Sequence, residues 1–215
     1  EALARNGLEE NTLVICFADH GLQFPRNMCN LTDHGIAVYL IIRGPGGFSG
    51  GQVSDALVSL IDLVPTACDV AELPAPDHAQ GYSLRPLVTT DTAEQLSSVR
   101  DEIFAEVNYH AAYEPMRCVR TERYKYIRRY DKRQQLVLPN IDETAAKALL
   151  LDQGWSQHPR DQEMLYDLIF DPNEAANLID RDDLSAVLTD LRNRLDHWMQ
   201  QTENPLLPNG HEQAP

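Results

Sequence analysis

Asp19 and His20 are the residues whose types and spacing most clearly permit chemistry, because a carboxylate and an imidazole stand side by side. They follow an apolar run, Leu13 to Phe17, whose β-branched and aromatic content predicts a buried strand. Gly21 comes next and favours an end to the strand there. Ligands of open α/β sheets bind beyond the carboxyl ends of the strands, where Asp with His can hold a divalent cation. The alternative is a turn in which Asp19 caps a backbone amide and His20 lies in solvent.

The elements around this pair are typical of an α/β fold. A helix within residues 1–10 leads into the first strand, and residues 36–42 form a second apolar run that ends at a glycine turn. Between the two runs, residues 22–35 are too irregular for a strand or a helix. A further helix is expected near Pro65, a residue suited to a first helical turn. Residues 1–100 are therefore expected to form an α/β part with buried strands.

Residues 101–205 predict a smaller α+β part. Segments 117–121 and 124–128 alternate with period two, which predicts an antiparallel hairpin with a solvated basic face. Apolar residues recur at helical spacing over 184–199 and predict a long helix that packs into a core, capped at Asp182–Asp183. The remaining expectations are a strand at 103–107, a helix at 143–151, a strand at 164–168 and a disordered tail at 206–215.

Composition narrows the class of partner. The chain has 215 residues and a formal net charge of −15, which argues against nucleic acid or an anionic membrane surface as a general partner. Eight of its 18 basic residues lie between Arg117 and Arg133, so an anion can still bind locally. No apolar run is long enough to span a bilayer. The four cysteines have no metal-like spacing and are interpreted as free thiols.

Several motifs, taken together and in chain order, resemble the sulfatase family of the alkaline phosphatase superfamily. They are Asn11 to Gly21, Phe24-Pro25-Arg26, Leu31 to Ile36, Leu40 to Gly46, Leu57 to Thr66, Gly81 to Leu84, Met116 to Ile127, Leu165 to Leu168, Asp171 to Glu174 and Asn177-Leu178. The resemblance implies the C-terminal part of an alkaline-phosphatase-like α/β sheet, followed by a small α+β subdomain. It also implies a sulfuric ester hydrolase, often exported to the periplasm or secreted, of which this chain is a C-terminal fragment.

The resemblance implies a cofactor and a substrate class. Residues 104–110 are similar to the heparan N-sulfatase group, so the expected substrate is a sulfated sugar such as an N-sulfated glucosamine. Asp19 and His20 match the pair that completes a calcium site, where the metal would act as a Lewis acid on the sulfate. The family's nucleophile is a formylglycine made from Cys in a Cys-x-Pro-x-Arg context, which none of the four cysteines has. The nucleophile is therefore expected in an N-terminal half outside this chain, and the chain alone is expected to be inactive.

Four side chains are candidate substrate contacts. Arg26 could bind the sulfate, and His110 the substrate or its leaving group. Arg117 and Arg120 offer planar guanidinium groups to an acidic sugar. The family usually carries a basic residue, most often Lys, four positions after the Phe of its Phe-Pro motif, and here that position is Met28. A thioether cannot donate a hydrogen bond to a sulfate oxygen, so either Arg26 compensates or the site is impaired.

Other interpretations stay open. Each of the four candidate side chains could be a surface group in solvent. Met28 is compatible with a phosphate-ester hydrolase of the same superfamily, which a Thr or Ser nucleophile upstream would indicate. From a different class, the chain could be a catalytically dead module that only binds a sugar or a partner, and sugar binding that ignores calcium would distinguish it.

Overall fold

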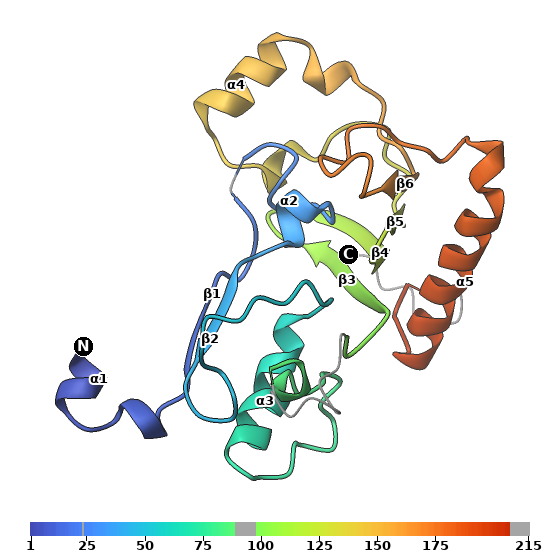
Figure 1. The fold of residues 1–215 in the computed structure, drawn as a ribbon. Coiled ribbons are helices and arrows are strands. Elements are labelled where there is room, and N and C mark those ends of the chain that lie inside the picture. Colours follow the sequence, from blue (N-terminus) through green and yellow to red (C-terminus); the bar gives the residue numbers. More distant parts are fainter. Residues whose placement is uncertain (23, 89–97, 207–215) are drawn as a thin grey trace. The chain divides into compact units, whose positions relative to one another are not determined.

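The computed structural model describes residues 1–22, 24–88 and 98–206, so that all but the first residue of the predicted tail lies outside the described part. The described chain forms two compact units (Figure 1). One contains Glu1–Asp19 and Val38–Ile103, and the other contains His20–Ala37 and Phe104–Pro215. The division after Ile103 lies close to the boundary that the sequence predicts. The sequence does not predict that residues 20–37 belong to the second unit.

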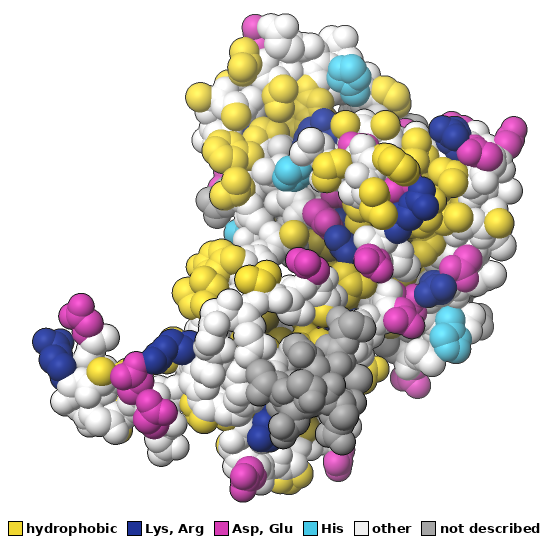
Figure 2. All heavy atoms as spheres, viewed as in Figure 1, with side chains coloured by type: hydrophobic (Ala, Val, Ile, Leu, Met, Phe, Trp, Pro, Cys, Tyr) yellow, Lys and Arg dark blue, Asp and Glu magenta, His cyan; other side chains and the backbone are white. Residues whose placement is uncertain are grey.

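The first unit contains a two-stranded ribbon. Strands β1 (Val14–Phe17) and β2 (Leu40–Arg43) pair antiparallel. Both predicted strands therefore exist, but their predicted burial is wrong. In the described part of the chain the ribbon has no further strand on either side, and side chains on it stay exposed, among them Phe17 and Ile41. Hydrophobic side chains also reach the surface elsewhere on the face of the molecule drawn in Figure 2.

A buried carboxylate organises the rest of this unit. Helix α3 (Leu63–Val70) begins where the sequence predicts, directly after Asp62. The Asp62 carboxylate is fully buried, accepts hydrogen bonds from the amides of Ser59 (2.8 Å) and Tyr82 (2.9 Å), and pairs with Arg100. These contacts join the loops around α3. The other helical elements here are α1 (Ala2–Arg5) and 3₁₀ turns at Glu9–Asn11, Leu60–Asp62 and Arg85–Leu87.

The second unit is built on a four-stranded sheet. Its strands lie in the order β3 (Glu102–Tyr109), β4 (Tyr113–Thr121), β5 (Tyr124–Arg129) and β6 (Glu163–Asp167). The antiparallel pairing of β4 with β5 confirms the predicted hairpin, and β6 pairs antiparallel with β5. Because side chains alternate along a strand, Cys118, Ile127 and Met164 share one face, and Val119, Tyr126 and Leu165 share the other.

Both faces of this sheet are buried by other elements. Helix α5 (Ser185–Gln201) packs its apolar stripe against one face, as the sequence predicts. Against the other face pack Leu31 and the short helix α2 (Asp33–Ile36). The predicted solvated face of the hairpin is therefore wrong, because Arg117 and Lys125 have no exposed surface.

The observed secondary structure differs from the predicted one in three places. Helix α2 covers the end of residues 22–35, for which the sequence predicts no helix, and extends to Ile36, while β2 begins only at Leu40. The expected aspartate cap of α5 is a 3₁₀ turn, Asp182–Leu184, and the cap position itself is Leu184. The predicted helix near 143–151 is confirmed as α4 (Ala145–Asp152), with 3₁₀ turns at Leu138–Asn140 and Trp155–Gln157 beside it. Within the described ranges, no helix has the length and hydropathy that a bilayer span requires.

Candidate functional site

The Asp19–His20 pair lies at the point where the chain leaves the first unit. Asp19 is the last residue of the segment after β1, His20 is the first residue of the second unit, and both are exposed. The Nδ1 of His20 lies 2.8 Å from the carbonyl oxygen of Gly21. A carbonyl oxygen only accepts, so Nδ1 is the donor in this hydrogen bond, and Nε2 would be the metal-binding nitrogen of the neutral ring. A metal-binding histidine is typically oriented in this way by a backbone carbonyl.

The donor chemistry of this pair fits a divalent cation, because it combines an anionic oxygen with a neutral imidazole nitrogen. The pair does not make a complete site by itself. In residues 1–22, 24–88 and 98–206, no group of three or more His, Cys, Asp or Glu side chains is placed to hold a metal ion. A calcium ion bound by Asp19 and His20 stays a prediction.

Two glycines shape the segment that follows the pair. The Gly21 amide donates to the Gly35 carbonyl oxygen at 2.8 Å, which closes residues 21–35 into a loop. A Cβ at Gly21 would lie 1.9 Å from the carbonyl oxygen of His34. A Cβ at Gly35 would lie 2.2 Å from the carbonyl oxygen of Asn30. Both positions therefore require glycine because another stretch of backbone passes too close for any side chain.

The tip of this loop carries Arg26 and Met28. Arg26 is exposed and has a φ of +69°, and Cys29 has a φ of +57°, so two non-glycine residues adopt the left-handed conformation. Pro25 and Leu31 are buried on either side and hold the loop in place. Such backbone strain is typical of functional loops whose surroundings fix them. The structure thus presents the Arg26 side chain to solvent and leaves Met28 half-buried.

A buried ion cluster fastens the loop to the sheet. The Lys125 ammonium on β5 lies 3.0 Å from Glu174 Oε1 and also pairs with Asp33 of α2. Arg120 Nη2 on β4 donates to Asp33 Oδ2 at 3.2 Å, and the Asp33 amide donates to the Glu174 carboxylate. The side chains of Lys125 and Glu174 are completely buried. One end of residues 20–37 is therefore held by charged groups from two strands and from the segment after β6.

The cluster shifts the two carboxyl groups in opposite directions. Burial raises the pKa of Glu174, and the attraction of Lys125 reduces this rise without overcoming it. Partial burial also raises the pKa of Asp33, but the charges and hydrogen bonds of Lys125 and Arg120 outweigh burial and lower it below its usual value. Asp33 is thus the carboxylate that the two cations hold ionised.

The candidate substrate residues occupy different environments. Arg120 faces Asp33, as described above. Arg117 is fully buried, and its guanidinium contacts Glu106 Oε2 at 2.9 Å, Asn108 Oδ1 at 2.7 Å and Asn204 Oδ1 at 3.1 Å. A sugar contact for Arg117 stays a prediction, and its burial favours a structural role instead. His110 is exposed in the turn between β3 and β4, where its amide donates to the Ala112 carbonyl oxygen at 3.4 Å.

No pattern in the sequence indicates the cavity that the second unit contains. It has a volume of about 420 Å³ and is lined by residues 133–137, Ala112 and Pro139. A basic run of the sequence ends at Arg133, but residues 134–139 have no periodic pattern. The cavity forms because distant segments meet there, which no local pattern reveals.

Comparison with known proteins identifies the family. The model of the family "N-sulphoglucosamine sulphohydrolase, C-terminal" matches residues 19–148, more than half of the chain. An ulvan-active sulfatase of Formosa agariphila is 28% identical over 93% of this chain and 35% of its own length. The N-sulphoglucosamine sulphohydrolase of Homo sapiens is 29% identical over 93% of this chain and 43% of its own length. The chain thus spans less than half the length of these relatives.

Solved structures agree with this assignment. A 2-O GAG sulfatase superposes with a TM-score of 0.70 at 25% identity, covering 94% of this chain and 39% of that one. The phosphonate monoester hydrolase of Agrobacterium radiobacter shares the fold, with a TM-score of 0.65 at 23% identity over 93% of this chain and 37% of that one. The predicted fold class, an alkaline-phosphatase-like α/β portion with antiparallel strands and a long last helix, is confirmed. The chain belongs to the sulfatases, as a member of the N-sulphoglucosamine sulphohydrolase C-terminal family.

Proposed function

We propose that this chain is the C-terminal part of a calcium-dependent sulfatase that hydrolyses the sulfate ester or N-sulfate of a sugar. The family match carries the proposal, because it begins at Asp19 and includes the whole loop that follows. The contact between His20 Nδ1 and the Gly21 carbonyl oxygen supports a metal role, because a backbone carbonyl commonly orients a metal-binding histidine in this way. The formylglycine nucleophile and the remaining metal carboxylates would come from sequence outside these 215 residues.

The metal pair, the loop with Arg26 and the buried ion cluster each have a part in this proposal. The Asp19 carboxylate and His20 Nε2 would bind the calcium ion, which supplies positive charge to polarise the sulfate group. The exposed Arg26 guanidinium would donate hydrogen bonds to sulfate oxygens, a task that the Met28 thioether cannot perform. The cluster of Lys125, Asp33 and Glu174 would keep the loop that carries Arg26 in one position.

The substrate class follows from the relatives. Their names refer to ulvan and to N-sulphoglucosamine. Residues 104–110, which include His110, favour an N-sulfated glucosamine, so a sulfated glycosaminoglycan is the proposed substrate. The chain as a whole is acidic, so an anionic substrate would be bound by the basic side chains that are concentrated in the second unit, between Arg117 and Arg133.

The decisive experiment measures sulfate release. A polypeptide that joins this chain to its upstream sequence should release inorganic sulfate from N-sulfated glucosamine with calcium present. It should act more weakly on an aryl phosphate, and the 215-residue chain alone should be inactive on both. Asp19→Asn should weaken calcium binding by at least roughly 10–100-fold. Loss of a residue that only supports a metal ligand already costs that much, and Asp19 would be a ligand itself. Turnover by the isolated chain, or a preference for phosphate, would contradict the proposal.

Met28 supports a second candidate function, a catalytically dead module that binds sugar. Without a donor at this position, sulfate binding at the loop would rest on Arg26 alone. Calorimetric titration separates the two functions. A sulfatase should bind a sulfated sugar more tightly when calcium is present, whereas a dead module should bind it equally well with calcium or with a chelator.

A further inference from the structure

The cavity beside the turn between β3 and β4 has walls from two parts of the chain. One wall is Ala112, two residues after His110, and the other is the stretch 133–137 with Pro139. All of these residues belong to the second unit. The cavity shares its turn with His110 but contains neither the metal pair nor the loop that follows it. It is therefore a feature that the proposed catalytic residues do not use.

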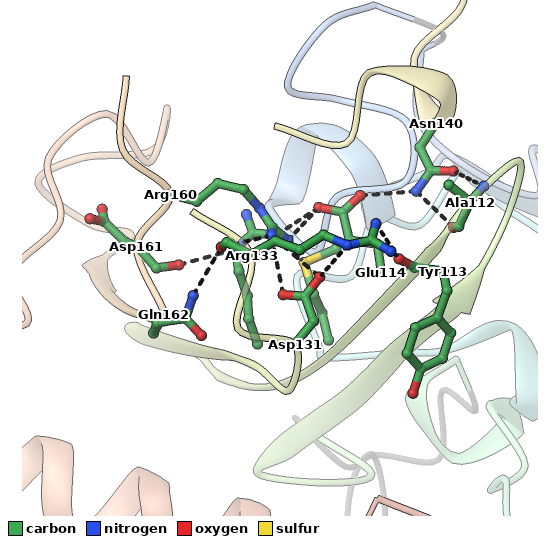
Figure 3. A network of polar contacts seen from close by, with 11 residues as sticks. Ala112, Tyr113, Glu114, Asp131, Arg133, Asn140, Arg160, Asp161 and Gln162 are labelled. Carbon is green, nitrogen blue, oxygen red and sulfur yellow. Dashed lines mark hydrogen bonds and ion pairs between the residues drawn. The ribbon is translucent and has the colours of Figure 1, made fainter. Parts of the chain in front are cut away.

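The Ala112 wall is held by one buried amide. Asn140 is 1% exposed, and its side chain makes two hydrogen bonds to the backbone of Ala112. Its Oδ1 accepts from the Ala112 amide at 2.7 Å, and its Nδ2 donates to the Ala112 carbonyl oxygen at 3.1 Å. The same Nδ2 lies 2.9 Å from Glu114 Oε2 (Figure 3). These contacts fix the turn relative to the segment that carries Pro139 and Asn140.

The opposite wall is held by Arg160. Its Nη1 donates to the Arg133 carbonyl oxygen at 3.3 Å, and its amide donates to the Gln134 carbonyl oxygen at 3.3 Å. Its Nη2 donates to Glu114 Oε1 at 2.8 Å. The Glu114 carboxylate therefore connects Arg160 on one side with Asn140 on the other (Figure 3). A single buried network clamps both walls, which makes the cavity preorganised.

The side chains that line the cavity suit an anionic sugar. Arg133 is about half exposed, and one of its N–H groups donates to the Tyr113 carbonyl oxygen at 3.0 Å. The Arg133 Nε lies 4.0 Å from the carboxylate of Asp131, which pairs more closely with Arg160, at 3.1 Å. The other donors of the Arg133 fork can therefore bind a carboxylate or sulfate. Gln134 and Gln135 add amides for hydroxyl groups, and an apolar surface for the sugar ring comes from Leu136, Val137 and Pro139.

We infer that this cavity binds an acidic sugar unit, with Arg133 holding its anionic group. That this unit belongs to the same sugar chain as the one that is desulfated rests on the proposed function, but binding in the cavity does not. The anionic group could be the carboxylate of a uronic acid or a second sulfate, which offer the same chemistry to a guanidinium.

The test uses nuclear magnetic resonance titration of the ¹⁵N-labelled chain. The probe is a heparin-derived disaccharide of a uronic acid and a sulfated glucosamine. The amide signals of Ala112, Gln134 and Gln135 should shift and saturate. Arg133→Ala should weaken binding roughly tenfold or more, as expected for a lost charge-assisted hydrogen bond. Lys132→Ala is the matched control, because Lys132 is exposed and adjacent but does not line the cavity, and it should change affinity by less than about twofold.

Two further probes identify the anionic group. The desulfated disaccharide should keep its affinity if the carboxylate binds, and the carboxyl-reduced disaccharide should keep it if a sulfate binds. Loss of affinity that is equal in Arg133→Ala and Lys132→Ala would overturn the inference, as would shifts that avoid the cavity. Its failure is separable from that of the proposed function. If the complete enzyme releases sulfate equally well with Arg133→Ala, only the binding site in the cavity is refuted. If the disaccharide binds saturably in the cavity but no sulfate is released, only the sulfatase function is refuted.

Discussion

The Lys125 ammonium lies 3.0 Å from Glu174 Oε1 in a place where neither side chain has exposed surface. Lys125 also pairs with Asp33, 92 residues earlier in the chain. Two carboxyl groups from separate segments thus converge on one cation of the central strand β5. This cation, together with Arg120, attaches the loop that begins at His20 to the sheet through Asp33.

Replacing Lys125 by methionine should strongly destabilise the second unit. Removing one partner from a buried ion pair leaves charge without compensation, which costs about 3–5 kcal/mol. Urea unfolding should show this loss, and hydrogen exchange should show faster opening of residues 20–37 than in the wild type. Arg181→Met is the matched control, because the Arg181–Asp183 pair is exposed and should contribute little. Equal effects of the two substitutions would contradict the role of Lys125.

This cluster shows where sequence reasoning stops. The period-two pattern of residues 117–128 is sufficient to predict the hairpin, because alternation is a local property of a strand. The pattern also placed Lys125 on a polar face, but it could not indicate that this face would be covered. Burial of a lysine depends on partners such as Asp33 and Glu174, and only the folded chain brings them together. The same limit explains why the clamp formed by Glu114, Asn140 and Arg160 had no signal in the sequence.

The ribbon of β1 and β2 shows the reverse error, because apolar residues that are predicted to be buried are exposed. The apolar content of β1 and β2 correctly predicts strands, yet the strands are not buried in the described chain. Hydrophobic composition reports a preference for burial, and whether that preference is met depends on which elements lie alongside. In Asp19-His20-Gly21 the structure gives the reason for one residue type: the His34 carbonyl oxygen lies so close to Gly21 that no side chain fits there.

Stability should decline in alkali because of Cys118. Burial raises the pKa of this thiol to about 12 from 9.0, partly offset by Lys125. In the unfolded chain the thiol loses its proton above pH 9, whereas in the folded chain it keeps the proton to about pH 12. The contribution is therefore complete below pH 9 and is lost as the pH rises from 9 to 12, by up to about 1.4 kcal/mol per pH unit.

The measurement is the free energy of unfolding as a function of pH. Between pH 9 and 10 the thiols contribute more than the tyrosines, because Tyr126 and Tyr166 lose their protons in the unfolded chain only near their ordinary pKa of 10.0, whereas burial raises their pKa to about 12 in the folded chain. Burial also raises the pKa of Cys29, so the contribution of Cys118 is read from the difference between the wild type and Cys118→Ala. Cys118→Ala lowers the absolute stability by leaving a cavity, but its decline over this interval should be shallower. Parallel curves for the wild type and the variant would show that Cys118 is not responsible.

Gly35→Ala should destabilise the loop by steric conflict. The new Cβ would lie 2.2 Å from one backbone oxygen and 2.3 Å from another, so the backbone must shift at a cost of about 1–3 kcal/mol. Gly7→Ala is the control for conformational preference, because Gly7 has a φ of +66° but open space around it. Thermal unfolding with both variants tests the difference. A Gly35→Ala protein as stable as the wild type would mean that the loop has room that the structure does not show.

Met28→Arg should strengthen sulfate recognition in the complete enzyme if the loop binds the sulfate group. A guanidinium at this position would add charge-assisted hydrogen bonds that the thioether cannot make, and kcat/KM for a sulfated sugar should rise about tenfold or more. The melting temperature should change little, since Met28 is only half-buried. Arg26→Ala is the companion variant, because Arg26 is the donor that the loop already presents. Loss of activity in Arg26→Ala that Met28→Arg restores would show that the two positions serve the same anion. An enzyme indifferent to both substitutions would exclude this loop from sulfate binding.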